Sequence, residues 1–548
     1  MENNEADTEA RPLKTNDEKV LENNDTTGDT NDSNKKPSWL SRCRTAAFFA
    51  SLFLCLTAVF AFSFIIPCPV RPYSQRTWSV QYSRASTYAF LSTEDVNQDN
   101  VQDVLFLFKA DDTDNLNVTC ADEGFRSPCS FLTALSGTNG STLWIKPVAE
   151  DVRLAECGIT NLGGMEFSGC IISGRPESLM AINSHTGNIL WKTATGFASN
   201  SVVRKPVLKI PDVNGDDVQD LMIFVSVEDE MQSFIFSGKN GDRIGQNKSI
   251  GIPRKDGHYT HATASGSQYV LMYTGGSIEG YSVRDLYSRI TDDEIKPVTL
   301  KTDPDWEGQT NHSAGYIPIL PISSSGDIRY LLKIPGKYYN NILIVKTEVS
   351  ELLDGQKFRS LWSLNTTNIL SKPALGYFKK DVLSIMMELG IGNGRKKVII
   401  IDSNSGTVQW EVEMNLGIVN PNPATLKTGD HRSFFLFWGE DNPDLNSTME
   451  ARENLYMFHP SYSKALLQLN NNTKNIVMFD AFLFEKSRHA CYVLLSGPNT
   501  LEMFNNVSIS KRKLKEDITT SKIVWLSKET ANEKDIRDHF FRMRYSSH

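Results

Sequence analysis

One stretch of the sequence, from Ala46 to Ile66, is free of charged residues over 21 positions. As a helix with about 1.5 Å of rise per residue, it would span roughly 30 Å, the thickness of the hydrocarbon core of a bilayer. No later part of the chain matches it, because the other apolar runs are short and interrupted by charges. The sequence therefore predicts a single-pass transmembrane helix at residues 46–66, with most of the chain on its carboxyl side.

Basic residues around this run predict its orientation. Four precede it closely, namely Lys35, Lys36, Arg42 and Arg44, and the basic residues after it are sparser. The positive-inside rule then places the amino terminus in the cytoplasm. The alternative is a cleaved signal peptide, but such apolar regions are usually about 7–15 residues long and lie nearer the start of a chain. We therefore expect an uncleaved signal anchor of type II topology.

The rest of the chain divides by composition. Residues 1–45 are rich in Glu, Asp, Asn and Thr and cannot bury enough apolar surface to offset their chain entropy, which predicts a disordered cytoplasmic tail. Residues 67–77 contain three prolines and predict a short, stiff stalk. The body is predicted at residues 78–515, and residues 516–548 form a carboxyl-terminal segment that packs on it or extends from it. A formal charge of −8 argues against a nucleic-acid partner.

The body has the pattern of an all-β protein. Apolar runs of about five residues, rich in Val, Ile, Phe and Tyr, alternate with turn residues, and no long 3.6-residue period occurs. A motif repeats in which an apolar strand is followed by a polar turn ending in glycine and then by a strand that usually closes on Trp. The turn glycines allow positive φ in a hairpin, and they are Gly140, Gly187, Gly241 and Gly406. Their spacing of about 50 residues predicts a β-propeller of seven or eight blades. The basic run Lys511–Lys513 is expected on a solvated edge strand.

Cysteines and glycosylation sequons both suit a body outside the cytoplasm. Two local cysteine pairs predict two disulfides, Cys120–Cys129 and Cys157–Cys170, and the alternative is buried free thiols. A zinc site is disfavoured because no CxxC spacing occurs. Eight sequons of the form N-x-S/T predict a glycosylated surface, and they begin at Asn117, Asn139, Asn247, Asn311, Asn365, Asn446, Asn471 and Asn506.

Two stretches share the pattern D-x-N-x-D-x-x-x-D, and their side-chain oxygens are candidate ligands for Ca²⁺. The residues are Asp95, Asn97, Asp99 and Asp103 in the first stretch and Asp212, Asn214, Asp216 and Asp220 in the second. Oxygens at positions 1, 3, 5 and 9, with a backbone carbonyl at position 7, can surround a hard cation. Apolar strands follow both stretches, so each predicts a structural calcium loop between two strands. The alternative is an Asx-rich turn without a metal.

These loops within a propeller pattern resemble the FG-GAP repeats of integrin alpha subunits. The layout as a whole resembles the integrin-alpha FG-GAP repeat containing membrane proteins, the family with sequence similarity 234. The similarity includes SRCRTAAFFASLFLCL (41–56), IIPCPVRP (65–72) and IRDHFFRMRY (536–545). It implies a type II plasma-membrane or cell-surface protein with a propeller ectodomain and no catalytic activity. The chain departs from integrins because only two loops keep the full acidic pattern.

Two classes of function remain open from the sequence. The first is a non-catalytic module that binds a protein partner or acts as an accessory subunit. The alternative is an extracellular propeller enzyme of quinoprotein-like type, because such enzymes share the repeat of glycine and tryptophan. Adjacent cysteines, an HExxH motif and a GxSxG motif are all absent from the sequence, which favours the first class.

Overall fold

The structure is a computed structural model of the chain. It describes residues 39–65, 77–112, 117–246, 249–291, 297, 299–311, 313–320, 326–417, 420–440, 453–469, 475–485, 489–498, 505–528 and 531–546. The chain divides into two compact units, Met1–Pro72 and Tyr73–His548. The predicted disordered tail up to residue 38 and the predicted stalk at residues 67–76 lie outside the described residues.

The described part of the first unit is one helix, α1 (Trp39–Ile65). It is free of glycine and proline and rich in Ala, Leu and Phe, and Pro67 follows its end. Its large apolar side chains are exposed, namely Phe48, Phe49, Leu52, Phe53, Leu54, Leu56, Val59, Phe60 and Phe62. None of the helices in the part of the chain that the structure describes has the length and apolarity needed to cross a bilayer.

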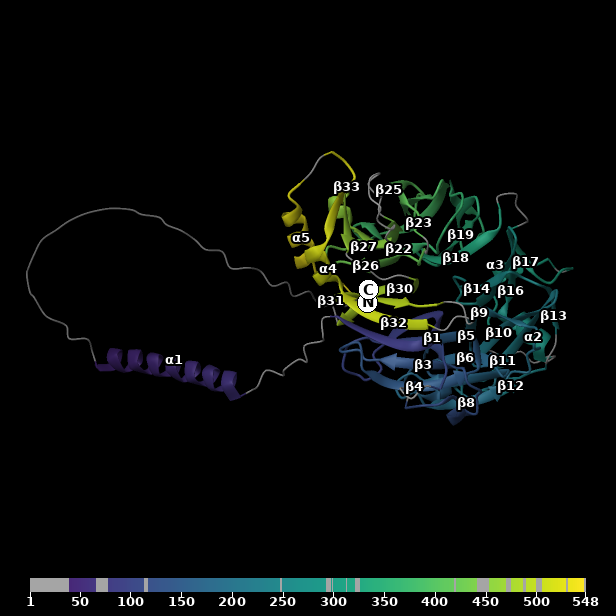
Figure 1. The fold of residues 1–548 in the computed structure, drawn as a ribbon, viewed down its shortest axis with the longest axis horizontal. Coiled ribbons are helices and arrows are strands. Elements are labelled where there is room, and N and C mark those ends of the chain that lie inside the picture. The colour runs from purple at the N-terminus through teal and green to yellow at the C-terminus, as the bar shows by residue number, and fades with distance from the viewer. Residues whose placement is uncertain are drawn as a thin grey trace, which may run out of the picture. The chain divides into compact units, whose positions relative to one another are not determined.

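The second unit consists mainly of antiparallel sheets that follow one another along the chain (Figure 1). Three sheets are four-stranded meanders. The first contains β5 (Asp151–Ile159), β6 (Gly169–Arg175), β7 (Ser178–Asn183) and β8 (Ile189–Ala194), and the second contains β14 (Gly257–Ala262), β15 (Gln268–Thr274), β16 (Ser277–Ser282) and β17 (Ile317–Leu320). The third contains β18 (Ile328–Pro335), β19 (Asn340–Lys346), β20 (Val349–Leu353) and β21 (Ser360–Asn365). A fourth contains β9 (Val202–Ile210), β10 (Asp220–Val227), β11 (Glu230–Phe236) and β12 (Arg243–Ile244), with β13 (Ser249–Pro253) paired to β11.

A seven-stranded sheet joins the two ends of the second unit. Its order is β30 (Ile476–Glu485), β31 (His489–Ser496), β32 (Asn505–Lys513), β1 (Trp78–Glu94), β2 (Asp103–Ala110), β3 (Cys129–Leu135) and β4 (Thr142–Ala149). The first half of β1 pairs with β32 and its second half pairs with β2, and each of the two pairings contains a register shift. Strand β1 is therefore the last strand of one four-stranded group and the first strand of the next.

A nine-stranded sheet contains two further groups joined by the single residue pair Asn415–Glu440. One group is β22 (Ala374–Lys379), β23 (Val382–Gly392), β24 (Arg395–Asp402) and β25 (Val408–Asn415). The other is β26 (Ala424–Lys427), β27 (Ser433–Glu440), β28 (Glu453–Phe458), β29 (Ala465–Leu469) and β33 (Lys522–Trp525). Short helices lie between strands, namely η1 (Cys120–Glu123), η2 (Leu162–Gly164), α2 (Val283–Thr291), α3 (Pro304–Glu307), η3 (Pro460–Tyr462) and α4 (Leu514–Thr520). Helix α5 (Glu533–Arg542) follows β33.

The first strands of neighbouring groups lie against one another. Strand β1 contacts both β5 and β30, β9 contacts both β5 and β14, and β26 contacts both β22 and β30. Successive groups bury apolar side chains between them in separate clusters, such as the one that joins β5–β8 to β9–β11. The second unit is an all-β propeller closed by its own first strand, as the repeat predicts.

Tryptophans in last strands connect one group to the next. The indole N–H groups of Trp78, Trp144, Trp191, Trp362 and Trp410 donate to carbonyl oxygens at distances of 2.8 to 3.2 Å. Four of these rings lie on the predicted turn glycines, Gly140, Gly187, Gly241 and Gly406, where an added Cβ would collide with the ring. These glycines have φ between 69° and 75°, which confirms the predicted hairpin turns.

Both predicted disulfides, Cys120–Cys129 and Cys157–Cys170, are present. The expectation for Lys511–Lys513 is wrong in part, because β32 lies between β31 and β1 and Lys511 is fully buried. The described sequon asparagines are all exposed, namely Asn117, Asn139, Asn311, Asn365 and Asn506. The other three, Asn247, Asn446 and Asn471, lie outside the described residues.

Candidate functional site

Two loops with the pattern D-x-N-x-D-x-x-x-D join a first strand to a second strand. Loop 1 is Asp95–Asp103, between β1 and β2, and loop 2 is Asp212–Asp220, between β9 and β10. Both have left-handed backbone at their fourth and sixth positions, at Gln98, Asn100, Gly215 and Asp217. The two loops therefore share one backbone conformation.

The side-chain oxygens of each loop accept hydrogen bonds from the loop's own backbone. Asp95 accepts from the N–H groups of Asp99 and Asn100, each at 3.0 Å. Asp212 accepts from the N–H groups four and five residues further on, at 3.3 and 2.9 Å. In both loops the asparagine at position 3 donates to the carboxylate at position 5, at 3.1 and 3.0 Å.

The last aspartate of each loop is buried. Asp103 accepts from three backbone N–H groups, including that of Gly137 at 2.8 Å. Asp220 Oδ2 accepts from Val213 N–H at 2.8 Å, but Oδ1 has no hydrogen-bond partner among the described residues. Gly238 N–H lies near enough to lower the pKa of Asp220 without reaching good hydrogen-bond geometry. Burial, opposed by these N–H groups, raises the pKa of each carboxyl to about 6.

The donor set of each loop suits a hard cation, because it consists of carboxylate, amide and carbonyl oxygens. The buried Asp220 Oδ1, with no hydrogen-bond partner among the described residues, adds to this fit at loop 2. In this structure, however, the carboxylates accept hydrogen bonds from backbone N–H groups. Within the described residues, no three His, Cys, Asp or Glu side chains gather as a metal-binding group.

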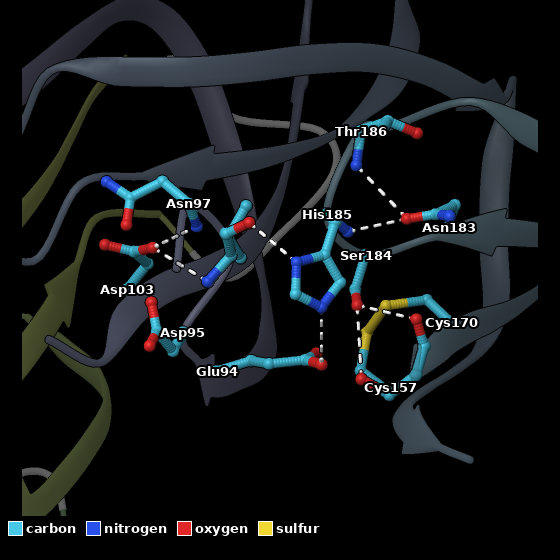
Figure 2. Close-up of polar contacts among 12 residues, drawn as sticks. Glu94, Asp95, Asn97, Asp103, Cys157, Cys170, Asn183, Ser184, His185 and Thr186 are labelled. Carbon is cyan, nitrogen blue, oxygen red and sulfur yellow. Dashed lines mark hydrogen bonds and ion pairs between the residues drawn. A yellow bond between two sulfur atoms is a disulfide. The ribbon is translucent and has the colours of Figure 1, made fainter. Parts of the chain in front are cut away.

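Figure 2 shows how a neighbouring group of strands contacts loop 1. His185, in the turn between β7 and β8, places Nδ1 2.8 Å from the carbonyl oxygen of Val96. A carbonyl only accepts, so Nδ1 donates in this contact. The other ring nitrogen lies 3.8 Å from Glu94 Oε1. His185 therefore fixes loop 1 against the adjacent group.

The segment between β5 and β6 contacts the turn beside loop 2 on one side and His185, which contacts loop 1, on the other. The Cys157–Cys170 disulfide closes this segment. On one side Gly163 N–H donates to the carbonyl of Gly238 at 2.8 Å. The residue before Gly238, Ser237, donates its hydroxyl to Asp216 of loop 2. On the other side the Phe167 ring lies 4.5 Å from the His185 ring, centroid to centroid. We call residues 161–168, together with loops 1 and 2, the loop surface.

The segment presents apolar side chains among acidic ones. Met165 and Phe167 are 42% and 39% exposed. The carboxylates of Asp99, Glu166 and Asp217 are exposed on the same three elements. The ammonium group of Lys239 beside loop 2 donates to the backbone carbonyl of Asp216 at 3.0 Å. The loop surface therefore combines an apolar centre with an acidic surround.

Comparison with known proteins decides the family. The FAM234A/B beta-propeller family matches residues 78–546. The chain belongs to this family. It is 41% identical to Protein FAM234A of Homo sapiens over 556 residues, covering 100% of each chain. The FAM234B protein of Homo sapiens is 27% identical, over 90% of this chain and 81% of that protein. The resemblance found in the sequence is thus confirmed.

Among solved structures, the propeller of this FAM234-family chain is similar to a quinohemoprotein alcohol dehydrogenase from Comamonas testosteroni. The TM-score is 0.43 and the identity 9%, over 81% of this chain and 78% of that one. A likeness this weak has no bearing on activity.

All eight predicted ligand residues lie in the two loops, four in each, and each loop is a separate candidate site. Sequence reasoning missed His185 and the segment 161–168. A signal was present, because Met165 and Phe167 interrupt a glycine-rich, polar stretch within a short predicted disulfide loop. The contact of His185 with Val96 joins residues 89 positions apart, and no local pattern indicates it.

Proposed function

We propose that this chain is a non-catalytic, membrane-anchored interaction module whose propeller binds a partner protein through the loop surface. The observation that supports this most is the exposure of Met165 and Phe167 between two acidic loops. Exposed apolar side chains with a polar surround are typical of protein contacts, and aromatic and methionine side chains are enriched there. The acidic surround suits a partner with basic side chains around an apolar residue.

We propose that residues 46–66 anchor the chain in the plasma membrane with the propeller outside the cell. The uncharged run and the basic residues before it support this orientation. The two disulfides fit an oxidising compartment. Five described sequon asparagines are exposed, so glycosylation there requires no rearrangement of the core.

We further propose that the propeller has eight blades and that loops 1 and 2 each bind one structural Ca²⁺. The count follows from seven groups that start at β1, β5, β9, β14, β18, β22 and β26, and an eighth formed by β30–β32 with the first half of β1. Support for calcium comes from the oxygen-only donor sets and the buried Asp220 Oδ1. Extracellular calcium is millimolar, so even a weak site of an extracellular module would be filled.

Proximity labelling from the propeller on intact cells tests the interaction. The wild-type chain is expected to label a defined set of surface proteins, and Met165→Asp with Phe167→Asp is expected to lose part of that set. The control is Leu361→Asp with Ile391→Asp, because those side chains are equally exposed, at 43% each, on other strands. An unchanged set with the Met165 and Phe167 variant would contradict the proposed surface.

Topology needs its own experiment. Protease added to intact cells is expected to digest the propeller and to spare a tag at the amino terminus, and an N-glycosidase is expected to increase gel mobility. Loss of the amino-terminal tag would reverse the proposed orientation.

A further inference from the structure

A group of basic residues lies where the chain enters the propeller. Trp78 at the start of β1 pairs with Lys511 of β32, and the next residues along β32 lead through Lys513 into α4. Just before β1, the Thr77 hydroxyl donates to Glu516 of α4 at 3.0 Å. Helix α4 contacts α5, and both lie in the yellow carboxyl-terminal part of Figure 1. The group therefore lies beside the point where the stalk meets the propeller.

Three cations of this group lack an anionic partner. Among the described residues, no carboxylate forms an ion pair with Lys513, Lys515 or Arg544. Burial first, and then the charges of Lys513 and Arg544, lower the pKa of Lys515. Of the two carboxylates in α4, Glu516 accepts the hydrogen bond from Thr77 and Asp517 pairs with Arg512. Like charges held this close indicate a surface that takes a negatively charged ligand.

An exposed aromatic ring lies within the same group. The Lys515 ammonium lies 5.6 Å from the centre of the Phe541 ring, and that ring is 44% exposed. Arg542 and Arg544, on either side of Met543, are exposed as well. Basic side chains around an exposed aromatic ring are typical of surfaces that lie in the headgroup region of a bilayer.

The length of the stalk limits where this surface can be. Ten residues, and so eleven steps from one residue to the next, lie between Ile66 at the end of the uncharged run and Thr77. Fully extended, they reach at most about 40 Å. If residues 46–66 cross the membrane, the basic group can therefore contact headgroups without unfolding of the propeller.

We propose that Lys513, Lys515, Arg544 and Phe541 form a rim that docks the propeller on the phospholipid headgroups around its own anchor. This inference rests on the proposed membrane anchor. Acidic loop 1 lies close to the rim, because Lys511 Nζ donates to the carbonyl of Gly137, and the N–H of Gly137 donates to Asp103 of that loop. Anionic headgroups would be repelled by loop 1, so the contact is confined to the rim. The rim thus sets a tilt of the propeller and leaves the loop surface free of the headgroups.

Hydrogen exchange of the full chain tests the rim. The chain is placed in maltoside micelles, in phosphatidylcholine nanodiscs, and in nanodiscs that also contain phosphatidylserine. Exchange in α4 and α5 is expected to be fastest in maltoside, which has no phosphate, and slowest with phosphatidylserine. K513E/K515E/R544E is expected to abolish this difference, since each basic residue strengthens contact with an anionic surface by about fivefold. The matched control K337E/K357E/K372E reverses three exposed lysines on other groups of strands and should keep it.

The outcomes separate the rim from the anchor. Equal exchange in all three environments, with the chain still inserted in the discs, would overturn the rim and leave the anchor standing. Slow exchange in maltoside as well would overturn it in favour of a protein surface. Failure of the chain to enter the discs would refute the anchor itself, and the rim with it. Should the triple variant not fold, loss of the wild-type difference at high salt supports the rim, and its persistence overturns it.

Discussion

Loops 1 and 2 have the same sequence pattern, yet their hydrogen bonds differ. Asp212 accepts four backbone N–H groups of its own loop, whereas Asp95 accepts two. Loop 1 receives His185 from the next group of strands, and its Asp103 accepts three backbone N–H groups. In loop 2 the backbone carbonyl of Asp212 accepts a hydrogen bond from the Thr299 hydroxyl at 2.8 Å. Asp220 accepts from one backbone N–H, and its buried Oδ1 has no partner among the described residues. At the buried last aspartate, protein contacts are therefore more complete in loop 1, and the proposed cation would add most at the buried Asp220 Oδ1 of loop 2.

The largest expected difference concerns the buried aspartates. Asp103→Ala leaves three backbone N–H groups without their acceptor, so we expect a loss of about 3–5 kcal/mol in the free energy of unfolding. Asp220→Ala leaves one, and we expect about 1–3 kcal/mol. Denaturant unfolding of the purified chain, compared by transition midpoints, measures both. Equal losses would remove the distinction between the loops.

Removal of calcium is expected to act mainly through loop 2. A ligand at a hundred times its Kd stabilises the folded state by about 2.7 kcal/mol, so a chelator should lower the melting temperature by several degrees. Asp212→Ala with Asp216→Ala should remove most of that shift, and Asp95→Ala with Asp99→Ala should remove less. A melting temperature that does not respond to the chelator would show that both loops are ordinary Asx turns.

The contacts from outside each loop make a smaller difference. His185→Ala removes the donor to Val96 and should cost about 1 kcal/mol, with faster hydrogen exchange in loop 1 only. Thr299→Val removes the donor to Asp212 and should speed exchange in loop 2 only. Faster exchange in both loops with either variant would mean that the loops are coupled.

The smallest expected effect comes from the fourth position of each loop. Gln98 has φ of 59° and Gly215 has φ of 79°, and a side chain in this left-handed region costs energy that glycine avoids. Gln98→Gly should therefore stabilise the chain by at most about 1 kcal/mol, and Gly215→Gln should destabilise it by a similar amount. Changes of the same sign in thermal melting would contradict the shared backbone.

The sequence predicts those parts of this molecule that depend on neighbours along the chain. Both disulfides, the turn glycines and the paired acidic loops are local patterns, and each lies where it was expected. The use of β1 by two groups of strands depends on closure of the ring, which no local pattern encodes. The burial of Lys511 has the same origin, because β1 covers the edge of β32. The position of the Trp306 ring likewise depends on a distant residue, because it stacks on His261, 45 residues earlier.

An experimental structure of the chain in calcium, with anomalous scattering from the bound ions, tests the central claim about the loops most directly. We predict one anomalous peak in each loop, surrounded by the oxygens of positions 1, 3, 5 and 9, with the higher occupancy in loop 2. Absence of a peak in both loops at millimolar calcium, with Asp95 and Asp212 still accepting backbone N–H groups, would contradict it.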